Sequence, residues 1–183
     1  LLDIGSGLSS PAIMWARLYP SIDISCVNIN YNQLQLAQKI VDEKTSSQRI
    51  HEINSTSTML PLSSNSIERI IALESAQHFK PFDNFISESY RVLKKNGIFT
   101  FAIPVVKKKS SIKNLGILAV TWSSEHYNQD FIISKTSKKF KIIEKIEIGS
   151  NVFEPLVDHY VKNRYRLKNN ILKEYPSYLE KIL

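Results

Sequence analysis

Five short apolar segments, separated by stretches with a helical pattern, constrain the fold of this chain more than any other feature. The segments are residues 1–4, 22–29, 49–53, 66–74 and 97–103. Strands that alternate with helices in this way form mostly parallel sheets, because parallel neighbours need crossover connections that pack on the faces of the sheet. The predicted fold class is therefore α/β, with a doubly wound, mostly parallel sheet.

The helices between these segments have recognisable starts. Ser10 can cap a helix whose first position is Pro11, and either Asn30 or Asn32 can cap the next helix. Pro81 precedes a third helix with apolar residues at helical spacing. The expected buried face of that third helix consists of Phe82, Phe85, Ile86, Ser89 and Leu93.

Two details refine the second half of this pattern. Residues 70–73 are apolar at every position, which predicts a strand that is buried on both faces. The sequence KKNG at 94–97 predicts the end of the third helix, with basic residues near the helix C-terminus and a glycine that turns the chain.

Beyond residue 103 the alternation weakens. The expected features are a loop with some helix at 104–123, a helix from Ser124 to about Lys135, a sixth strand at 141–148, and helices over 152–182 that break near Pro176. No repeat or Pro/Gly-rich linker interrupts the chain. We therefore expect residues 1–183 to form one domain, with a ligand-binding core at 1–103 and a more divergent region at 104–183.

Composition narrows the class of protein. A chain of 183 residues with 43% hydrophobic and 22% charged residues is typical of ordinary soluble domains, and no stretch approaches the roughly 20 apolar residues of a membrane span. The single Cys26 cannot form an internal disulfide, which favours a cytoplasmic setting. The net charge of +7 is spread out, and its clusters at 105–113 and 138–141 are more typical of a solvated basic surface than of a nucleic-acid site.

Polar residues collect where the predicted strands end. The carboxyl ends of parallel strands share one edge of the sheet, where α/β proteins bind ligands. These ends are Gly5-Ser6-Gly7, Asn28-Ile29-Asn30, Asn54-Ser55-Thr56 and Glu74-Ser75-Ala76-Gln77-His78. Gly5 and Gly7 permit a close approach of ligand to backbone at the start of a helix, although such a pair also occurs in ordinary βα turns. Four polar ends in succession favour a nucleotide-like site.

The segments LLDIGSG, VNINYNQ, NSTSTMLPL, RIIALESAQHF and SESYRVLKKNGIFTFA follow one another in the chain. In this order they resemble the class I S-adenosylmethionine-dependent methyltransferases over residues 1–103. The sequences RVLKKNG and ESAQHF are most similar to the small-molecule branch, which includes erythromycin- and rebeccamycin-type O-methyltransferases. The resemblance implies a Rossmann-like methyltransferase sheet, S-adenosylmethionine as cofactor and a small-molecule acceptor, with oxygen favoured over nitrogen or carbon.

The resemblance also implies a set of cofactor-binding residues. They are Asp3, Gly5, Ser6, Gly7, Asn28, Ile29, Gln33, Ser55, Thr56 and Glu74. The glycine turn would approach the methionine part of the cofactor, and Asp3 would orient its amino group. Asn28 stands where most relatives have an acid that holds the ribose hydroxyls, and residues 55–56 lie where the adenine edge is recognised. The alternatives are helix capping by Asn28 and Gln33, and a plain surface position for Glu74. No metal ligands are implied.

His78 is the candidate catalytic residue. An alcohol or phenol that accepts a methyl group must lose a proton, which a histidine can take at neutral pH. Related antibiotic enzymes have two adjacent histidines here, but Gln77 stands at the first position, so His78 either acts as the base or shapes the pocket. His126 and His159 fall in the region expected to form the acceptor pocket, with helix-surface positions as the alternative, and His51 is expected to be structural.

Two departures from the family pattern bear on activity. Ser9 replaces the third glycine of the turn. The family also places a helical segment before the first strand, where it covers cofactor and acceptor, whereas this chain begins with that strand. We therefore expect a fragment truncated at the N-terminus, whose uncovered site admits water and positions substrates less well. No seventh strand is predicted after residue 150.

Two other functions fit parts of the sequence. RNA methylation would use the positive charge, but ALESAQHF stands where an N/D-P-P-Y/F sequence would follow the fourth strand. A non-catalytic scaffold that retains the fold would account for Ser9, Gln77 and the missing first segment. We make no prediction of the oligomeric state.

Overall fold

The computed structural model describes residues 1–44, 49–106 and 125–174. The chain divides into two compact units, Leu1–Lys141 and Ile142–Leu183. The elements of the first unit are β1 (Leu2–Ile4), α1 (Ser10–Leu18), β2 (Ile24–Asn28), α2 (Tyr31–Lys44), β3 (Ile50–Asn54), β4 (Ile67–Leu73), the 3₁₀ turn η1 (Ala76–His78), α3 (Phe82–Val92), β5 (Leu93–Ala102) and α5 (Gln129–Thr136). The second unit contains α6 (Gly149–Glu174). Ser124, Pro176 and most of the basic cluster at 105–113 lie outside the described residues.

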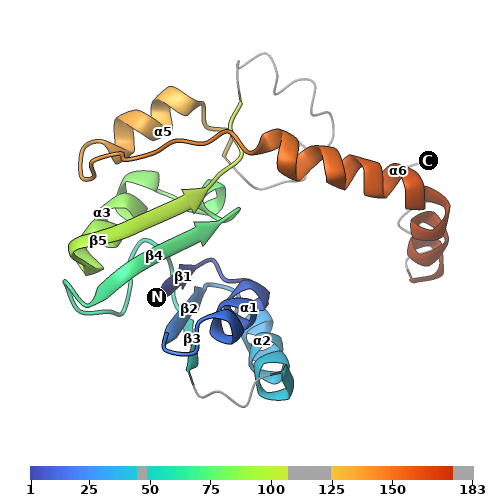
Figure 1. The fold of residues 1–183 in the computed structure, drawn as a ribbon, viewed down its shortest axis with the longest axis horizontal. Helices are drawn as coiled ribbons and strands as arrows, with labels where there is room; N and C mark the ends of the chain where they lie inside the picture. Colours follow the sequence, from blue (N-terminus) through green and yellow to red (C-terminus); the bar gives the residue numbers. More distant parts are fainter. Residues whose placement is uncertain (45–48, 107–124, 175–183) are drawn as a thin grey trace. The chain divides into compact units, whose positions relative to one another are not determined.

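The strands form one parallel sheet in the order β3-β2-β1-β4-β5 (Figure 1). Every neighbouring pair in this sheet is parallel, which confirms the predicted fold class. β1 lies in the middle, with Leu2 opposite both Ser25 of β2 and Ile70 of β4. The glycine turn that follows β1 therefore sits at the centre of the carboxyl edge, with the ends of β2 and β4 on either side.

Helices cover the two faces of the sheet in separate places. On one face, α1 and α2 pack on β2 and β3 through a cluster that includes Ile24 and Cys26. Val27, the next residue of β2, belongs to the cluster on the opposite face, where α3 contributes Phe82, Phe85 and Ile86. Successive side chains of a strand point to opposite faces, so this alternation shows that the sheet is covered on both sides. The doubly wound arrangement is confirmed.

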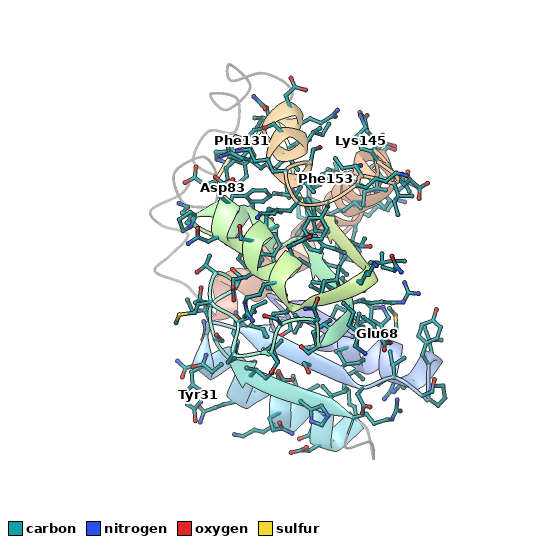
Figure 2. The ribbon with its side chains drawn as sticks, turned by 90° about the vertical axis from the view of Figure 1, so that its left-hand side faces the viewer. Tyr31, Glu68, Asp83, Phe131, Lys145 and Phe153 are labelled. Carbon is teal, nitrogen blue, oxygen red and sulfur yellow. The ribbon has the colours of Figure 1, made fainter. Side chains whose placement is uncertain are left out.

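The third helix has the predicted buried face, with one exchange at its end. Phe82, Phe85, Ile86 and Ser89 are buried as expected, but Leu93 begins β5 and Val92 completes the helical face instead. Figure 2 shows Asp83 of α3 and Phe131 of α5 near each other, and the two helices are joined by a Lys135–Asp83 ion pair and by contact between the Phe82 and Phe131 rings, whose centroids are 6.0 Å apart.

Two predictions about β4 and β5 are wrong. β4 is buried on one face only: Ile70 and Ala72 face α3, whereas Arg69 and Leu73 are exposed. The helices on the other face, α1 and α2, pack on β2 and β3 and leave β4 uncovered there. The residues at 94–97 do not turn the chain after the helix but form the irregular start of β5, where pairing with β4 jumps from Ile67–Leu93 to Arg69–Ile98. Asn96, with φ of 64°, accommodates this bulge.

The predicted sixth strand at 141–148 is wrong. None of these residues is in a strand, and Ile143 and Ile146 are 83% and 66% exposed. A strand needs a neighbour to pair its backbone groups, and the described residues that follow form α6 instead. The helix predicted from 152 is confirmed as far as Glu174, and its expected break near Pro176 falls in undescribed residues. No helix among the described residues is long and apolar enough to cross a membrane.

The structure also corrects the predicted helix caps. Ser9, not Ser10, occupies the N-cap position of α1, where its carbonyl accepts from Ile13 N at 3.0 Å and its side chain makes no capping bond. Asn30 is the residue that caps α2, because its Oδ1 accepts from Gln33 N at 3.2 Å. α5 begins at Gln129 and is capped by Asn128, later than predicted.

Candidate functional site

The turn after β1 has a left-handed backbone at three positions. Gly5, Gly7 and Ser9 have φ values of 79°, 58° and 54°, a region that favours glycine. A Cβ at Gly5 would lie 2.4 Å from Ser75 Cβ, whereas a Cβ at Gly7 would meet no atom within 4 Å. Gly5 therefore allows β1 to pack against the end of β4, and the space beside Gly7 is open. Ser9 adopts the conformation of the glycine that it replaces, and its side chain is buried.

Side chains at the end of β2 are joined to this turn by hydrogen bonds. Asn28 Nδ2 donates to Gly7 O at 3.2 Å and to Gln33 Oε1 at 2.9 Å. Asn28 Oδ1 accepts from Asn30 N at 3.3 Å and retains a second lone pair. The structure thus brings together Gly7, Asn28 and Gln33, three of the predicted cofactor-binding residues. Capping of α2 is done by Asn30, so it does not account for the Asn28 and Gln33 side chains.

The loop after β3 is tied to the end of β2. Ser55 N donates to Asn28 O at 3.2 Å, and Ser55 Oγ donates to Met59 O at 3.0 Å. Thr56 Oγ1 lies 2.9 Å from Thr58 Oγ1. Ile29 and Met59 are 74% and 73% exposed. These two apolar side chains come from loops that are bonded to each other, and they offer apolar surface beside a polar edge.

Met59 was missed by the sequence analysis. Its signal was an apolar residue directly after the polar stretch NSTST at residues 54–58, which begins at the end of β3.

Asp3 lies in a row of buried acidic and thiol groups below the turn. It is opposite Cys26 in β2, and Cys26 is opposite Glu52 in β3, so all three point to the face covered by α1. Asp3 is only 3% exposed. Burial, and then the nearby Glu52 carboxylate, raise the pKa of Asp3 to about 7. Burial likewise raises the pKa values of Glu52 and Cys26.

The end of β4 supplies the remaining predicted residues. Glu74, with φ of 48°, is exposed and its backbone N–H donates to Ala102 O in β5. His78 is also exposed, at the end of η1. Gln77 Nε2 donates to Glu74 O at 2.7 Å and lies 3.4 Å from His78 Nε2. These contacts place Glu74 and His78 on one short segment, next to the glycine turn that packs on Ser75.

The other histidines are placed in three different settings. His51 is exposed on β3, and His159 is exposed on α6 of the second unit. His126 is half-buried in the segment before α5, and not on a helix surface.

Ser75 ties β1 to β4, because its Oγ donates to Ile4 O at 2.8 Å in the interior. The sequence analysis missed this residue.

Comparison with known proteins agrees with this geometry. The sequence profile of the family described as "Methyltransferase domain" matches residues 2–101. Erythromycin 3''-O-methyltransferase of Saccharopolyspora erythraea is 22% identical over 177 residues, which are 88% of this chain and 57% of that protein. Sterol 24-C-methyltransferase of Pneumocystis carinii is 29% identical over 99 residues, which are 54% of this chain and 26% of that protein.

A solved structure extends the likeness to nearly the whole chain. Phosphoethanolamine N-methyltransferase 2 of Haemonchus contortus, solved with S-adenosylhomocysteine, matches with a TM-score of 0.79 at 19% identity. The match covers 97% of this chain and 41% of that protein. The chain thus spans between about a quarter and three fifths of the length of these three proteins. Because the family profile matches more than half of the chain, the chain belongs to the methyltransferase domain family, as its resemblance to the class I S-adenosylmethionine-dependent methyltransferases predicted.

Proposed function

We propose that this chain binds S-adenosylmethionine at the carboxyl edge of its sheet and transfers the methyl group to a hydroxyl oxygen of a small molecule. The observation that carries the proposal is the hydrogen-bonded set Gly7–Asn28–Gln33, which joins two neighbouring strand ends beside open space. The residues present fit the cofactor, because the edge combines this open glycine with the exposed apolar side chains Ile29 and Met59.

The proposed cofactor contacts follow the strand ends. The Gly5–Gly7 turn would face the methionine part, and Asn28 Oδ1 would accept from a ribose hydroxyl. Residues 55–56 would border the adenine, with Ile29 offering apolar surface. Glu74 would stand beside the methionine end. When bound, S-adenosylmethionine supplies a methyl group already activated on a sulfonium, so the work of the protein is positioning and proton removal.

His78 and Asp3 are the two residues of the proposed site that would take up or lose a proton. His78 would take the proton of the acceptor hydroxyl, and its exposed position leaves the ring accessible to an incoming acceptor. Asp3 would attract the cofactor's ammonium group from below the turn. Because the pKa of Asp3 is raised to about 7, part of the carboxyl is protonated near neutral pH. The cofactor's positive charge would favour the ionised form, so cofactor binding and loss of the Asp3 proton would be coupled.

The acceptor atom is the finer part of the proposal. The three named relatives are an O-, a C- and an N-methyltransferase. Oxygen is favoured by the match with the O-methyltransferase, which covers 88% of this chain, and by a histidine at the end of β4. We also propose that residues 104–183 belong to the same methyltransferase domain and contribute to the acceptor side.

Isothermal titration with S-adenosylhomocysteine tests the cofactor site. We expect micromolar binding by the wild-type chain and binding at least about tenfold weaker in Asn28→Ala, because each lost hydrogen bond to a ligand costs on the order of 1 kcal/mol or more. Asn32→Ala is the matched control: Asn32 is exposed in the first turn of α2, four residues after Asn28, and its loss should leave the affinity unchanged. A folded chain that shows no binding at about 1 mM would overturn the proposal.

A further inference from the structure

The segment before α5 is fastened beside the carboxyl end of β4. Glu125 N donates to Gln77 O at 2.9 Å, and the Glu125 carboxylate pairs with Lys80 Nζ at 2.7 Å. The centroids of the Tyr127 and Phe82 rings are 5.2 Å apart. These contacts come from both residues that flank His126. They hold His126 next to η1, although the two are far apart in the sequence.

Two polar atoms in these touching segments are buried and have no hydrogen-bond partner in the described structure: Gln77 Oε1 and His126 Nε2. Gln77 is only 6% exposed. Its amide cannot simply be reversed, because Nε2 donates to Glu74 O at 2.7 Å and a reversed amide would set two oxygens against each other. Buried polar groups in folded proteins nearly always have partners, and an unpaired one costs about 1–3 kcal/mol.

The two atoms differ in what they can bind. An amide oxygen such as Gln77 Oε1 only accepts, whereas a neutral imidazole nitrogen such as His126 Nε2 either donates or accepts, depending on the tautomer. A hydroxyl group matches this pair, since it donates one hydrogen bond and accepts another. A carboxylate or phosphate oxygen does not match it, because it has no proton to give to Gln77.

We propose that Gln77 and His126 together bind a hydroxyl group of the methyl acceptor, and that the acceptor is an uncharged alcohol or phenol. The inference rests on the proposed methyltransferase function and adds the chemical class of its acceptor. Gln77 would orient the hydroxyl before the reaction, and the proton that it holds would pass on methyl transfer to His78, the next residue of η1. The sequence placed His126 in the expected acceptor region but gave Gln77 no binding role.

The test uses the full chain saturated with S-adenosylhomocysteine, with phenol as the probe and its methyl ether, anisole, as the matched probe without a hydroxyl proton. The ring nitrogens of ¹⁵N-labelled histidine and the Gln77 side-chain amide are followed by nuclear magnetic resonance. We expect phenol, but not anisole, to shift the His126 Nε2 and Gln77 signals. Phenol affinity should fall about tenfold in His126→Phe and in Gln77→Met, and stay unchanged in His51→Phe, which alters an exposed histidine on β3.

The outcomes separate this inference from the function on which it rests. S-adenosylhomocysteine should bind the wild-type chain, His126→Phe and Gln77→Met with affinities within about twofold of one another. If the wild-type chain fails to bind it, the proposed function is overturned, and this inference with it. If it binds but phenol leaves the His126 and Gln77 signals unmoved, or phenol and anisole act alike, only the hydroxyl site is overturned. The signals of the wild-type chain decide this even if a variant does not fold.

Discussion

Replacing Asp3 by asparagine measures how much the buried carboxyl below the glycine turn contributes to the free energy of unfolding. Burial and the Glu52 carboxylate raise the pKa of Asp3 from its ordinary value of 3.8 to about 7 in the folded protein. The folded state therefore holds its proton more tightly than the unfolded chain does. Asparagine has nearly the same shape and never ionises, so Asp3→Asn removes the cost of burying this charge.

The sign of the pH dependence follows from the two pKa values. Below pH 3.8 the carboxyl is protonated in both states and costs nothing. As the pH rises toward 7 the unfolded chain ionises first, so the free energy of unfolding falls, and above about 7 the penalty is complete. At 1.36 kcal/mol per pKa unit the full penalty is about 4 kcal/mol, taken as an upper bound.

Urea unfolding at a series of pH values measures this effect. The free energy of unfolding of Asp3→Asn minus that of the wild-type chain should grow by about 3 kcal/mol between pH 5 and 8.5. Asp23→Asn, which changes an exposed acid near the start of β2, is the control and should show no such growth. An Asp3→Asn difference that stays constant with pH would refute the reasoning, because the carboxyl would then ionise as easily in the folded protein as in the unfolded chain.

Three further substitutions test the packing that builds the edge. Gly5→Ala should lower the free energy of unfolding by at least about 2 kcal/mol in a urea titration, because its Cβ would meet Ser75 and its φ is 79°; a loss below about 0.5 kcal/mol would contradict the close approach. Asn30→Ala should cost about 1 kcal/mol by the same measurement through the lost cap of α2, and an unchanged midpoint would show that the cap is dispensable. Arg91→Ala should lower the thermal midpoint through the loss of bonds to Glu88 and to the Leu60 carbonyl, roughly 2 kcal/mol in total; an unaltered midpoint would count against this link.

The sequence predicted the parts of the fold that local patterns determine. The five strands, the parallel sheet and α3 follow from apolar periodicity, and the glycine turn follows from residue type. Pairing is not local, and this is why the prediction for 141–148 failed: a stretch rich in isoleucine favours extended backbone but does not supply a neighbouring strand. The one-residue error at the start of α1 arose because Ser9 adopts a left-handed conformation that glycine normally supplies.

The candidate site was predictable to a similar extent. Residues at strand ends could be named because parallel strands share an edge. The hydrogen bonds between Asn28 and Gln33 and between Glu125 and Gln77 could not, since they depend on side-chain geometry and on distant segments meeting. The raised pKa of Asp3 arises first from its burial and then from the strand register that aligns it with Glu52 through β2, and no sequence pattern encodes either.

Amide chemical-shift mapping with S-adenosylhomocysteine tests the central claim most directly. If the carboxyl edge is the cofactor site, the largest shifts of the ¹⁵N-labelled chain fall on residues 5–7, 28–30 and 54–56, the ends of β1, β2 and β3. Small shifts there, with the largest ones on α3, α5 or α6, would contradict the account, as would the absence of any shift in a folded sample at millimolar ligand.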